Sequence, residues 1–233
     1  MTFDPPLIPV RFLRRYQRFL ADVEDAQNRV LTVHVPNPGR MTSCLGEGWP
    51  ALISESGRPA RRLRHTLEML HNGESWIGVQ TLRANGLALE ALRAGLLPGL
   101  ETGWQWSREQ RHGGSRLDLL GRRESGAHIW VEVKSVTLRL EDGCAAFPDA
   151  VTARGLRHLE ELCACRAAGA RALLLLVVQR EDVDGFRPAD EVDPAWAAGL
   201  RRAAAQGVEV AALRLALSPT ELRTVGLLPI HGL

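Results

Sequence analysis

The side chains best suited to chemistry lie in two short runs, SRLDLL at residues 115–120 and WVEVKSVTL at residues 130–138. If both runs are strands, Glu132 and Lys134 point to one face, because residues i and i+2 of a strand share a side. A hairpin between the runs would bring Asp118 beside Glu132. Two adjacent carboxylates repel each other unless a cation lies between them, and oxygen ligands of this kind suit Mg²⁺ or Mn²⁺. The pattern therefore predicts a divalent-metal site.

Lys134 is the only lysine in the chain, and the other members of the 29 Lys and Arg residues are all arginine. Arginine is a planar, strongly basic fork, whereas lysine is a compact point charge. Beside a metal, a lysine could orient an attacking water or neutralise charge that develops on a phosphodiester. The tripeptide E-V-K by itself favours an ordinary Glu–Lys pair on an exposed strand. Asp118, fourteen residues upstream of Glu132, favours the catalytic interpretation.

The composition is that of a globular protein of 233 residues, with 45% apolar and 24% charged residues and a net charge of +2. No apolar run is long enough to cross a bilayer, and the first residues do not have the pattern of a signal peptide. We therefore expect a cytoplasmic location and no membrane partner. The four cysteines lack the spacing of a zinc site, so we expect free thiols. The small net charge means that any basic surface must be local.

Residues 1–81 contain short strand-like runs separated by turn residues. The runs at 18–25 and 29–35 flank the polar turn DAQN and predict a hairpin, and further strands are expected at 49–56 and 74–81. A basic segment that begins at Arg58 lies between the last two. Four or five short strands in such a span favour a small barrel of the OB type, a fold that often binds oligonucleotides.

Residues 82–233 have a different character, in which helical and strand-like patterns alternate. Apolar spacing and capping residues predict helices at 82–100, 147–169 and 193–207, the first ending at Pro98-Gly99 and the second opening at Pro148-Asp149. Strands are expected at 115–121, 128–140, 171–179 and 208–217. Within 171–179, residues 172–178 form a continuous apolar run, which is typical of a strand covered on both faces. This order predicts a second domain of the α/β class.

The residues also carry a resemblance to known families. Asp118 followed by Glu132-x-Lys134 is similar to the D…(D/E)-x-K signature of the PD-(D/E)xK nuclease superfamily. More narrowly, the chain resembles the sugar fermentation stimulation protein A family along nearly its whole length. The matching stretches are RRYQRFLADV, VHVPNPGRM, RANGLALEAL, SRLDLL, WVEVKSVTL, FPDAVTARGLRHLEEL and QREDVDGFRPADEVDP.

This resemblance implies an N-terminal OB-fold β-barrel, a PD-(D/E)xK restriction-endonuclease-like α/β domain, and DNA as the partner. It also implies that Asp118, Glu132 and the Val133 carbonyl hold a Mg²⁺ or Mn²⁺ ion, with Glu90 as a further metal-binding and catalytic carboxylate. Lys134 would be the catalytic lysine. The sequence departs from the superfamily's name at one position, because Leu117 and not a proline precedes Asp118.

Several arginines are candidates for contact with DNA phosphates. They are Arg14, Arg15, Arg18 and Arg40 in the first domain and Arg116 and Arg154 in the second. Arg116 shares a strand face with Asp118, although a surface salt bridge would explain it equally well. Arg40 follows the turn PNPG, which is also simply a good turn.

Three further polar residues lie near these candidates. His158 stands four residues after Arg154 on the predicted helix and so shares its side, where an ordinary helix surface is the favoured interpretation. Asp149 is interpreted as a helix N-cap. Gln179 ends a strand at a place where some nucleases of the superfamily have an active-site glutamine.

Three functions remain open at this stage. The first is a metal-dependent nuclease that acts at Glu90, Asp118, Glu132 and Lys134. The second is a non-enzymatic DNA-binding regulator that uses the nuclease fold as a scaffold, which the family's name favours because it implies a role in sugar utilisation. The third is an enzyme that uses the same site on RNA or nucleotides, since no residue that would distinguish DNA from RNA is visible.

Overall fold

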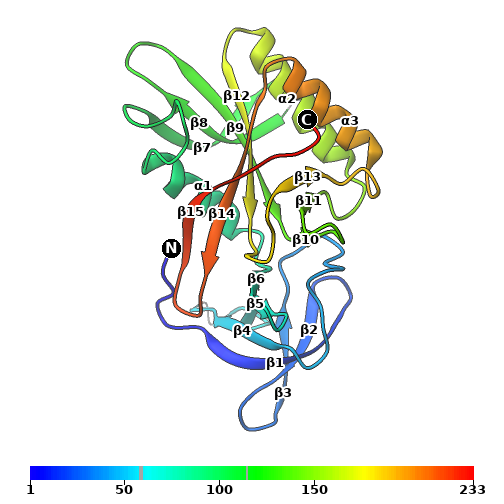
Figure 1. The fold of residues 1–233 in the computed structure, drawn as a ribbon. Coiled ribbons are helices and arrows are strands. Elements are labelled where there is room, and N and C mark those ends of the chain that lie inside the picture. The colour runs from blue at the N-terminus through cyan, green and yellow to red at the C-terminus, as the bar shows by residue number, and fades with distance from the viewer. Residues whose placement is uncertain (58–59, 114) are drawn as a thin grey trace.

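The computed structural model describes residues 1–57, 60–113 and 115–233, and Arg58 lies outside them. The chain forms a barrel of short strands followed by a larger sheet that is covered by helices (Figure 1). The last strand of the barrel region ends at Gly78, and the first helix begins at Arg83. All four cysteines are free. None of the helices in the described part of the chain is both long and apolar enough to span a membrane.

The first region is a closed barrel of five strands with a short sixth strand at its edge. The strands are β1 (Ile8–Tyr16), β2 (Leu20–Glu24), β3 (Val30–His34), β4 (Pro50–Glu55), β5 (His65–His71) and β6 (Trp76–Gly78). They follow the order β3-β2-β1-β4-β5-β6, and a parallel pairing of β3 with β5 closes the barrel. The predicted barrel is therefore confirmed, as is the β2–β3 hairpin.

Two barrel strands were missing from the sequence prediction. All of β1 precedes the first predicted run, and β5 lies in the basic segment for which no strand is predicted. Arginines crowd both segments, and they hide the alternation that marks a strand. In the barrel the five central residues of β5 are nevertheless buried, because Leu67 and Leu70 face the barrel core while Met69 packs into the cluster under α1.

The second region is built on a six-stranded mixed sheet of order β15-β14-β12-β9-β8-β7. Its strands are β7 (Gln105–His112), β8 (Ser115–Arg122), β9 (His128–Val136), β12 (Arg171–Val178), β14 (Glu209–Leu217) and β15 (Leu222–Leu228). The three central strands, β9, β12 and β14, are parallel, and β7–β8–β9 form an antiparallel meander. The small strands β10 (Leu138–Arg139), β11 (Ala145–Phe147) and β13 (Phe186–Pro188) make a separate sheet at the junction. The edge strands β7 and β15 were not predicted.

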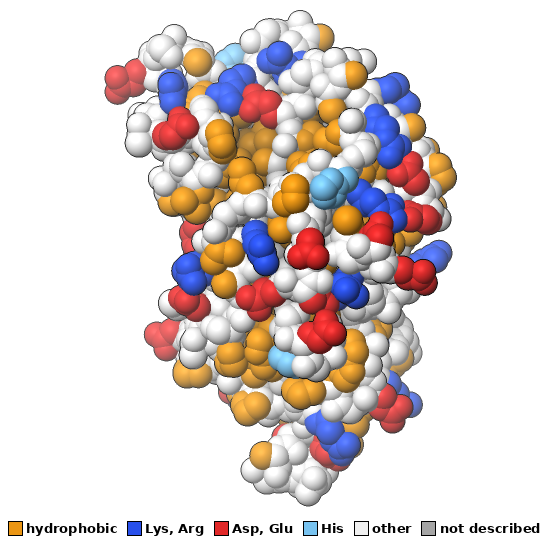
Figure 2. Space-filling model, viewed as in Figure 1, with side chains coloured by type: hydrophobic (Ala, Val, Ile, Leu, Met, Phe, Trp, Pro, Cys, Tyr) orange, Lys and Arg blue, Asp and Glu red, His pale blue; other side chains and the backbone are white. Residues whose placement is uncertain are grey.

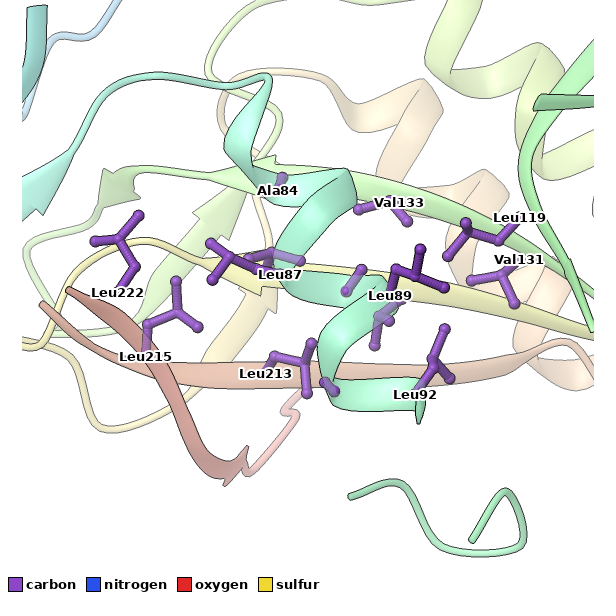
Figure 3. Packing of buried hydrophobic residues seen from close by; sticks show 14 of the residues in the cluster. Ala84, Leu87, Leu89, Leu92, Leu119, Val131, Val133, Leu213, Leu215 and Leu222 are labelled. Atoms are coloured by element: carbon purple, nitrogen blue, oxygen red, sulfur yellow. The ribbon is translucent and has the colours of Figure 1, made fainter. Parts of the chain in front are cut away.

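Three helices cover the large sheet: α1 (Arg83–Arg93), α2 (Ala153–Ala167) and α3 (Pro194–Ala205). Helix α1 packs Leu87, Leu89 and Leu92 onto β9, β12 and β14 from one face (Figure 3). On the other face α2 and α3 pack together over a second cluster around Leu174 and Trp196. Because helices cover both faces, every residue of β12 after Arg171 is apolar and buried, as expected.

Two helix boundaries differ from the prediction. Helix α1 ends at Arg93 and not at Pro98-Gly99, since Gly95 takes a positive φ of 68° and the Leu96 N–H returns to the Ala91 carbonyl. Helix α2 begins later than predicted. Its N-cap is Thr152, whose side chain accepts the Gly155 N–H, so the interpretation of Asp149 as the cap is wrong.

Asp149 instead joins the two domains. Its Oδ2 accepts the Met41 N–H at 3.1 Å, and a Cβ on Gly39 would lie 2.1 Å from the same oxygen. A second link is the backbone bond from Gly78 N–H to the Gln179 carbonyl, at 2.8 Å. The barrel turn that contains PNPG (36–39) thus packs against Asp149, in the segment that precedes α2.

Candidate functional site

Asp118 lies where the pairing of β8 with β9 stops. The paired register runs from Arg122 opposite His128 to Leu119 opposite Val131, and Asp118 is the next residue. Its Oδ2 accepts the Val133 N–H at 2.8 Å, so a side chain takes the place of a backbone partner. The carboxylate is thereby fixed next to the backbone of the strand that carries Glu132.

Helix α1 supplies a second contact to this carboxylate. The Asn85 amide donates to Asp118 Oδ1 at 2.8 Å. Burial, followed by the nearby charge of Glu132, raises the pKa of Asp118, although the Val133 N–H and Asn85 oppose the rise. Asn85 was not among the predicted site residues, and only its position in RANGLALEAL pointed to it. Burial and the neighbouring Glu132 charge therefore both favour the neutral form of Asp118.

Glu132 and Lys134 share a strand face, as the spacing predicted. The Lys134 ammonium lies 2.5 Å from Glu132 Oε1, and the carboxylate is almost fully buried, with 2% of the side chain exposed. His158 of α2 contacts the same Oε1 through its Nδ1 and lies 3.2 Å from Lys134 Nζ. Only 9% of the His158 side chain is exposed, so its interpretation as ordinary helix surface is wrong.

The two carboxylate oxygens of Glu132 have different surroundings. Burial alone would raise the pKa of this group, but His158 and Lys134 together hold it below its usual value. Glu132 is therefore a charged carboxylate in a buried place. Its Oε1 has two partners, whereas Oε2 is buried and has no hydrogen-bond partner among the described residues. A charged, buried oxygen with no partner is costly unless a cation completes it.

Glu90 lies elsewhere on α1. Its carboxylate is half exposed and pairs with the amino terminus of Met1 at 3.1 Å. Asn85 faces Asp118, and five residues along a helix correspond to a rotation of about 140°. The structure thus brings together Asp118, Glu132 and Lys134, but it does not bring Glu90 to them.

The oxygen atoms around Asp118 and Glu132 form a small donor set for a metal ion. No cluster of three or more His, Cys, Asp or Glu side chains suited to a metal occurs within residues 1–57, 60–113 and 115–233. Two carboxylates remain, those of Asp118 and Glu132, and the Val133 N–H is bonded to the first of them. This hard-oxygen set, with the unpartnered Glu132 Oε2, suits an ion that keeps several waters.

The comparisons with known proteins agree with the two-domain fold. Residues 82–221 match the family model described as "Sugar fermentation stimulation protein RE domain", and residues 13–79 match "SfsA N-terminal OB domain". The chain belongs to the SfsA family. The fold is accordingly an OB barrel followed by a restriction-endonuclease-like domain, as the resemblance implied.

Relatives in the SfsA family match over almost the full chain. A "Sugar fermentation stimulation protein homolog" of Acidithiobacillus ferrooxidans is 46% identical over 219 residues, which is 94% of each chain. The homolog of Teredinibacter turnerae is 46% identical and covers 99% of both chains. Among solved structures, that of Pyrococcus furiosus SfsA in complex with Ca²⁺ is 32% identical, with a TM-score of 0.87, and covers 99% of this chain and 98% of the other.

Three of the predicted DNA-contact arginines in the SfsA N-terminal barrel have internal partners. Arg15 donates to the carbonyls of Asn37, Gly39, Arg40 and Arg18, so its guanidinium holds the PNPGR loop in place. Arg18 donates to the Pro38 carbonyl, and Arg14 pairs with Asp22. The Arg15 guanidinium is thus occupied by hydrogen bonds within the protein, whereas 74% of the Arg14 side chain is exposed.

The other three arginines are more open. Arg40 is exposed and its side chain has no hydrogen bond or ion pair to any described residue. Arg116 forms an exposed ion pair with Glu109 at 3.4 Å, which matches the surface salt bridge that the sequence left open. Arg154 is exposed and donates to His158 Nε2 at 3.3 Å, so it stands directly beside the site. Blue and red side chains are interspersed on the face shown in Figure 2, in keeping with the small net charge.

Gln179 lies at the domain junction. Its side chain is fully buried, and its Nε2 donates to Ser135 Oγ at 2.7 Å. Ser135 directly follows Lys134, so Gln179 steadies the end of the site strand. In this structure it contacts neither Asp118 nor Glu132.

Proposed function

We propose that this SfsA-family protein binds DNA and hydrolyses phosphodiester bonds with the help of a divalent metal ion. The observation that carries the proposal is Glu132 Oε2, a buried oxygen of a charged carboxylate with no partner among the described residues, next to Asp118. The relative from Pyrococcus furiosus, whose structure contains Ca²⁺, supports a divalent ion. We infer Mg²⁺ or Mn²⁺ as the working ion, because hydrolytic sites with few protein oxygens commonly use them.

In this proposal Asp118, Glu132 and the Val133 carbonyl hold the metal, and Glu90 remains a further candidate only if α1 shifts. When bound, such an ion polarises the phosphodiester and lowers the pKa of a water. Asn85 and the Val133 N–H keep Asp118 oriented. Lys134 supplies positive charge beside Glu132, where it orients the attacking water or neutralises charge on the phosphate.

The DNA would lie across both domains. Arg154 stands beside the site, and Arg40 lies on the barrel loop that Asp149 seats against the segment before α2. Arg116 is on the same strand as Asp118. These three exposed guanidiniums can each contact a phosphate, Arg14 and Arg18 are further candidates on the barrel, and Arg15 shapes its loop.

The test is incubation of labelled single-stranded, duplex and branched DNA, and of RNA, with Mg²⁺ or Mn²⁺. Wild-type protein should cleave at least one DNA substrate, and E132A and K134A should abolish cleavage. Cleavage that persists in both variants would show a contaminating nuclease. Cleavage of RNA alone would move the proposal from DNA to RNA.

One observation favours a second function, a non-enzymatic DNA-binding regulator. Lys134 is ion-paired with Glu132, and within the described part of the chain no group of three or more His, Cys, Asp or Glu side chains could hold a metal. A nuclease-like site that no longer catalyses but still carries Asp118, Glu132 and Lys134 would have the same arrangement. The same experiment separates the two: DNA binding without cleavage of any substrate, with either metal, would establish the regulator.

A further inference from the structure

Helix α2 contributes a residue to the site that the D…(D/E)-x-K pattern does not include. His158 is buried and contacts Glu132 Oε1 through Nδ1. Its other ring nitrogen, Nε2, lies 3.3 Å from Arg154 Nε. The imidazole therefore links an exposed guanidinium to a buried carboxylate.

The roles of donor and acceptor in this chain follow from the arginine. Its Nε–H can only donate, so His158 Nε2 must accept and carries no proton. The ring proton is then assigned to Nδ1, which faces Glu132 Oε1, and Lys134 Nζ, 3.2 Å from Nδ1, donates to that oxygen and not to the ring. Lys134 also donates to Oε1, so both donors engage one oxygen and leave Oε2 without a partner among the described residues.

We propose that His158 is a positioning residue for the cation site: it anchors Glu132 through Oε1, so that Oε2 stays available to a divalent cation. Arg154 fixes the tautomer that this contact requires. Histidines and carboxylates that are held by an outer partner commonly bind metals better than unsupported ones. The inference rests on the proposed function, because it needs a cation at Glu132.

The competing explanation is that His158 only fills space between α2 and β9. The two explanations differ in what a substitution does. H158L fills a similar volume without a donor, whereas H158N keeps an amide N–H close to the position of Nδ1. A packing residue would tolerate leucine better than asparagine, and a positioning residue would show the reverse order.

The experiment is calorimetric titration of Ca²⁺ into the full-length protein, which needs no turnover. H158L is expected to bind about 10- to 100-fold more weakly than wild type, and H158N is expected to recover most of the affinity. R157A is the matched control, since Arg157 is an exposed arginine of the same helix and has no hydrogen bond or ion pair to Glu132 or His158. It should bind like wild type.

The Ca²⁺ affinities of these variants decide whether His158 positions Glu132. Equal Ca²⁺ affinity in H158L and wild type, or H158N as weak as H158L, would overturn the role of His158 while the metal site stands. If the wild type does not bind Ca²⁺, or if D118N binds it as tightly as the wild type does, the proposed function is overturned and this inference with it. If H158L does not fold, nitrogen-15 NMR of the wild type is sufficient, because a proton on Nε2 of His158 would contradict the tautomer on which the inference depends.

Discussion

The buried ion pair between Arg180 and Asp182 should govern how firmly the two domains are joined. Arg180 has 2% of its side chain exposed and binds Asp182 with two bonds of 2.7 Å. Its Nη1 also donates to the Thr137 carbonyl and to Ser43 Oγ of the barrel, at 2.7 and 3.0 Å. Asp182 in turn accepts from Asn72 of the barrel at 2.9 Å. One guanidinium therefore satisfies acceptors from both domains.

R180A would leave Asp182, Ser43 and the Thr137 carbonyl buried with fewer partners. Removing one member of a buried, hydrogen-bonded ion pair costs about 3–5 kcal/mol. The control is R201A, because Arg201 also binds an aspartate, Asp190, with two bonds of 2.7 and 2.8 Å, but with 40% of the arginine side chain exposed. An exposed pair of this kind contributes less than about 1 kcal/mol.

The assay is equilibrium unfolding in urea, followed by fluorescence and circular dichroism. R180A should lose several times more free energy of unfolding than R201A, and its two probes should separate as the barrel unfolds before the sheet domain. A loss of unfolding free energy in R180A no larger than that in R201A would refute the reasoning.

The pH dependence of stability gives a second check. Burial would raise the pKa of Asp182, but Arg180 holds it below its usual value, so this pair stabilises the fold at neutral pH. That contribution is lost as the pH falls through the lowered pKa of Asp182. In R180A the free energy of unfolding should therefore depend less on pH in this acid range than it does in the wild type.

Two further predictions concern the domain contact and the site. G39A should lower the free energy of unfolding by about 1–3 kcal/mol in urea titrations, because its Cβ would displace Asp149 from the Met41 N–H; an unchanged midpoint would contradict this. In metal-free protein, D118N should raise the free energy of unfolding at pH 7, since burial and the charge of Glu132 raise the pKa of Asp118 and its ionised form therefore disfavours folding. That gain should shrink as the pH falls below the raised pKa, and Mn²⁺ should raise the melting temperature of wild type but not of D118N.

Local patterns in the sequence were enough for the elements whose residues alternate or cap cleanly. β12 is an apolar run, α3 begins at the Asp193 N-cap, and β8 and β9 flank a turn of glycine and polar residues. β7 and β15 were missed because edge strands expose polar or charged side chains on alternate positions or at their ends. Their strand state comes from pairing with β8 and β14, which lies outside any local window.

The same division applies to the site. The sequence alone determined that Glu132 and Lys134 share a face, since a strand has a period of two, and it predicted that a hairpin would bring Asp118 near them. Only the tertiary structure decided that Asn85 of α1, and not Glu90, reaches Asp118, and that His158 of α2 reaches Glu132. The physical reason is that these contacts depend on how each helix is rotated on the sheet. That rotation is set by the packing of its apolar face, of which Leu87 on α1 and Leu159 on α2 are part, and not by the spacing of the polar residues themselves.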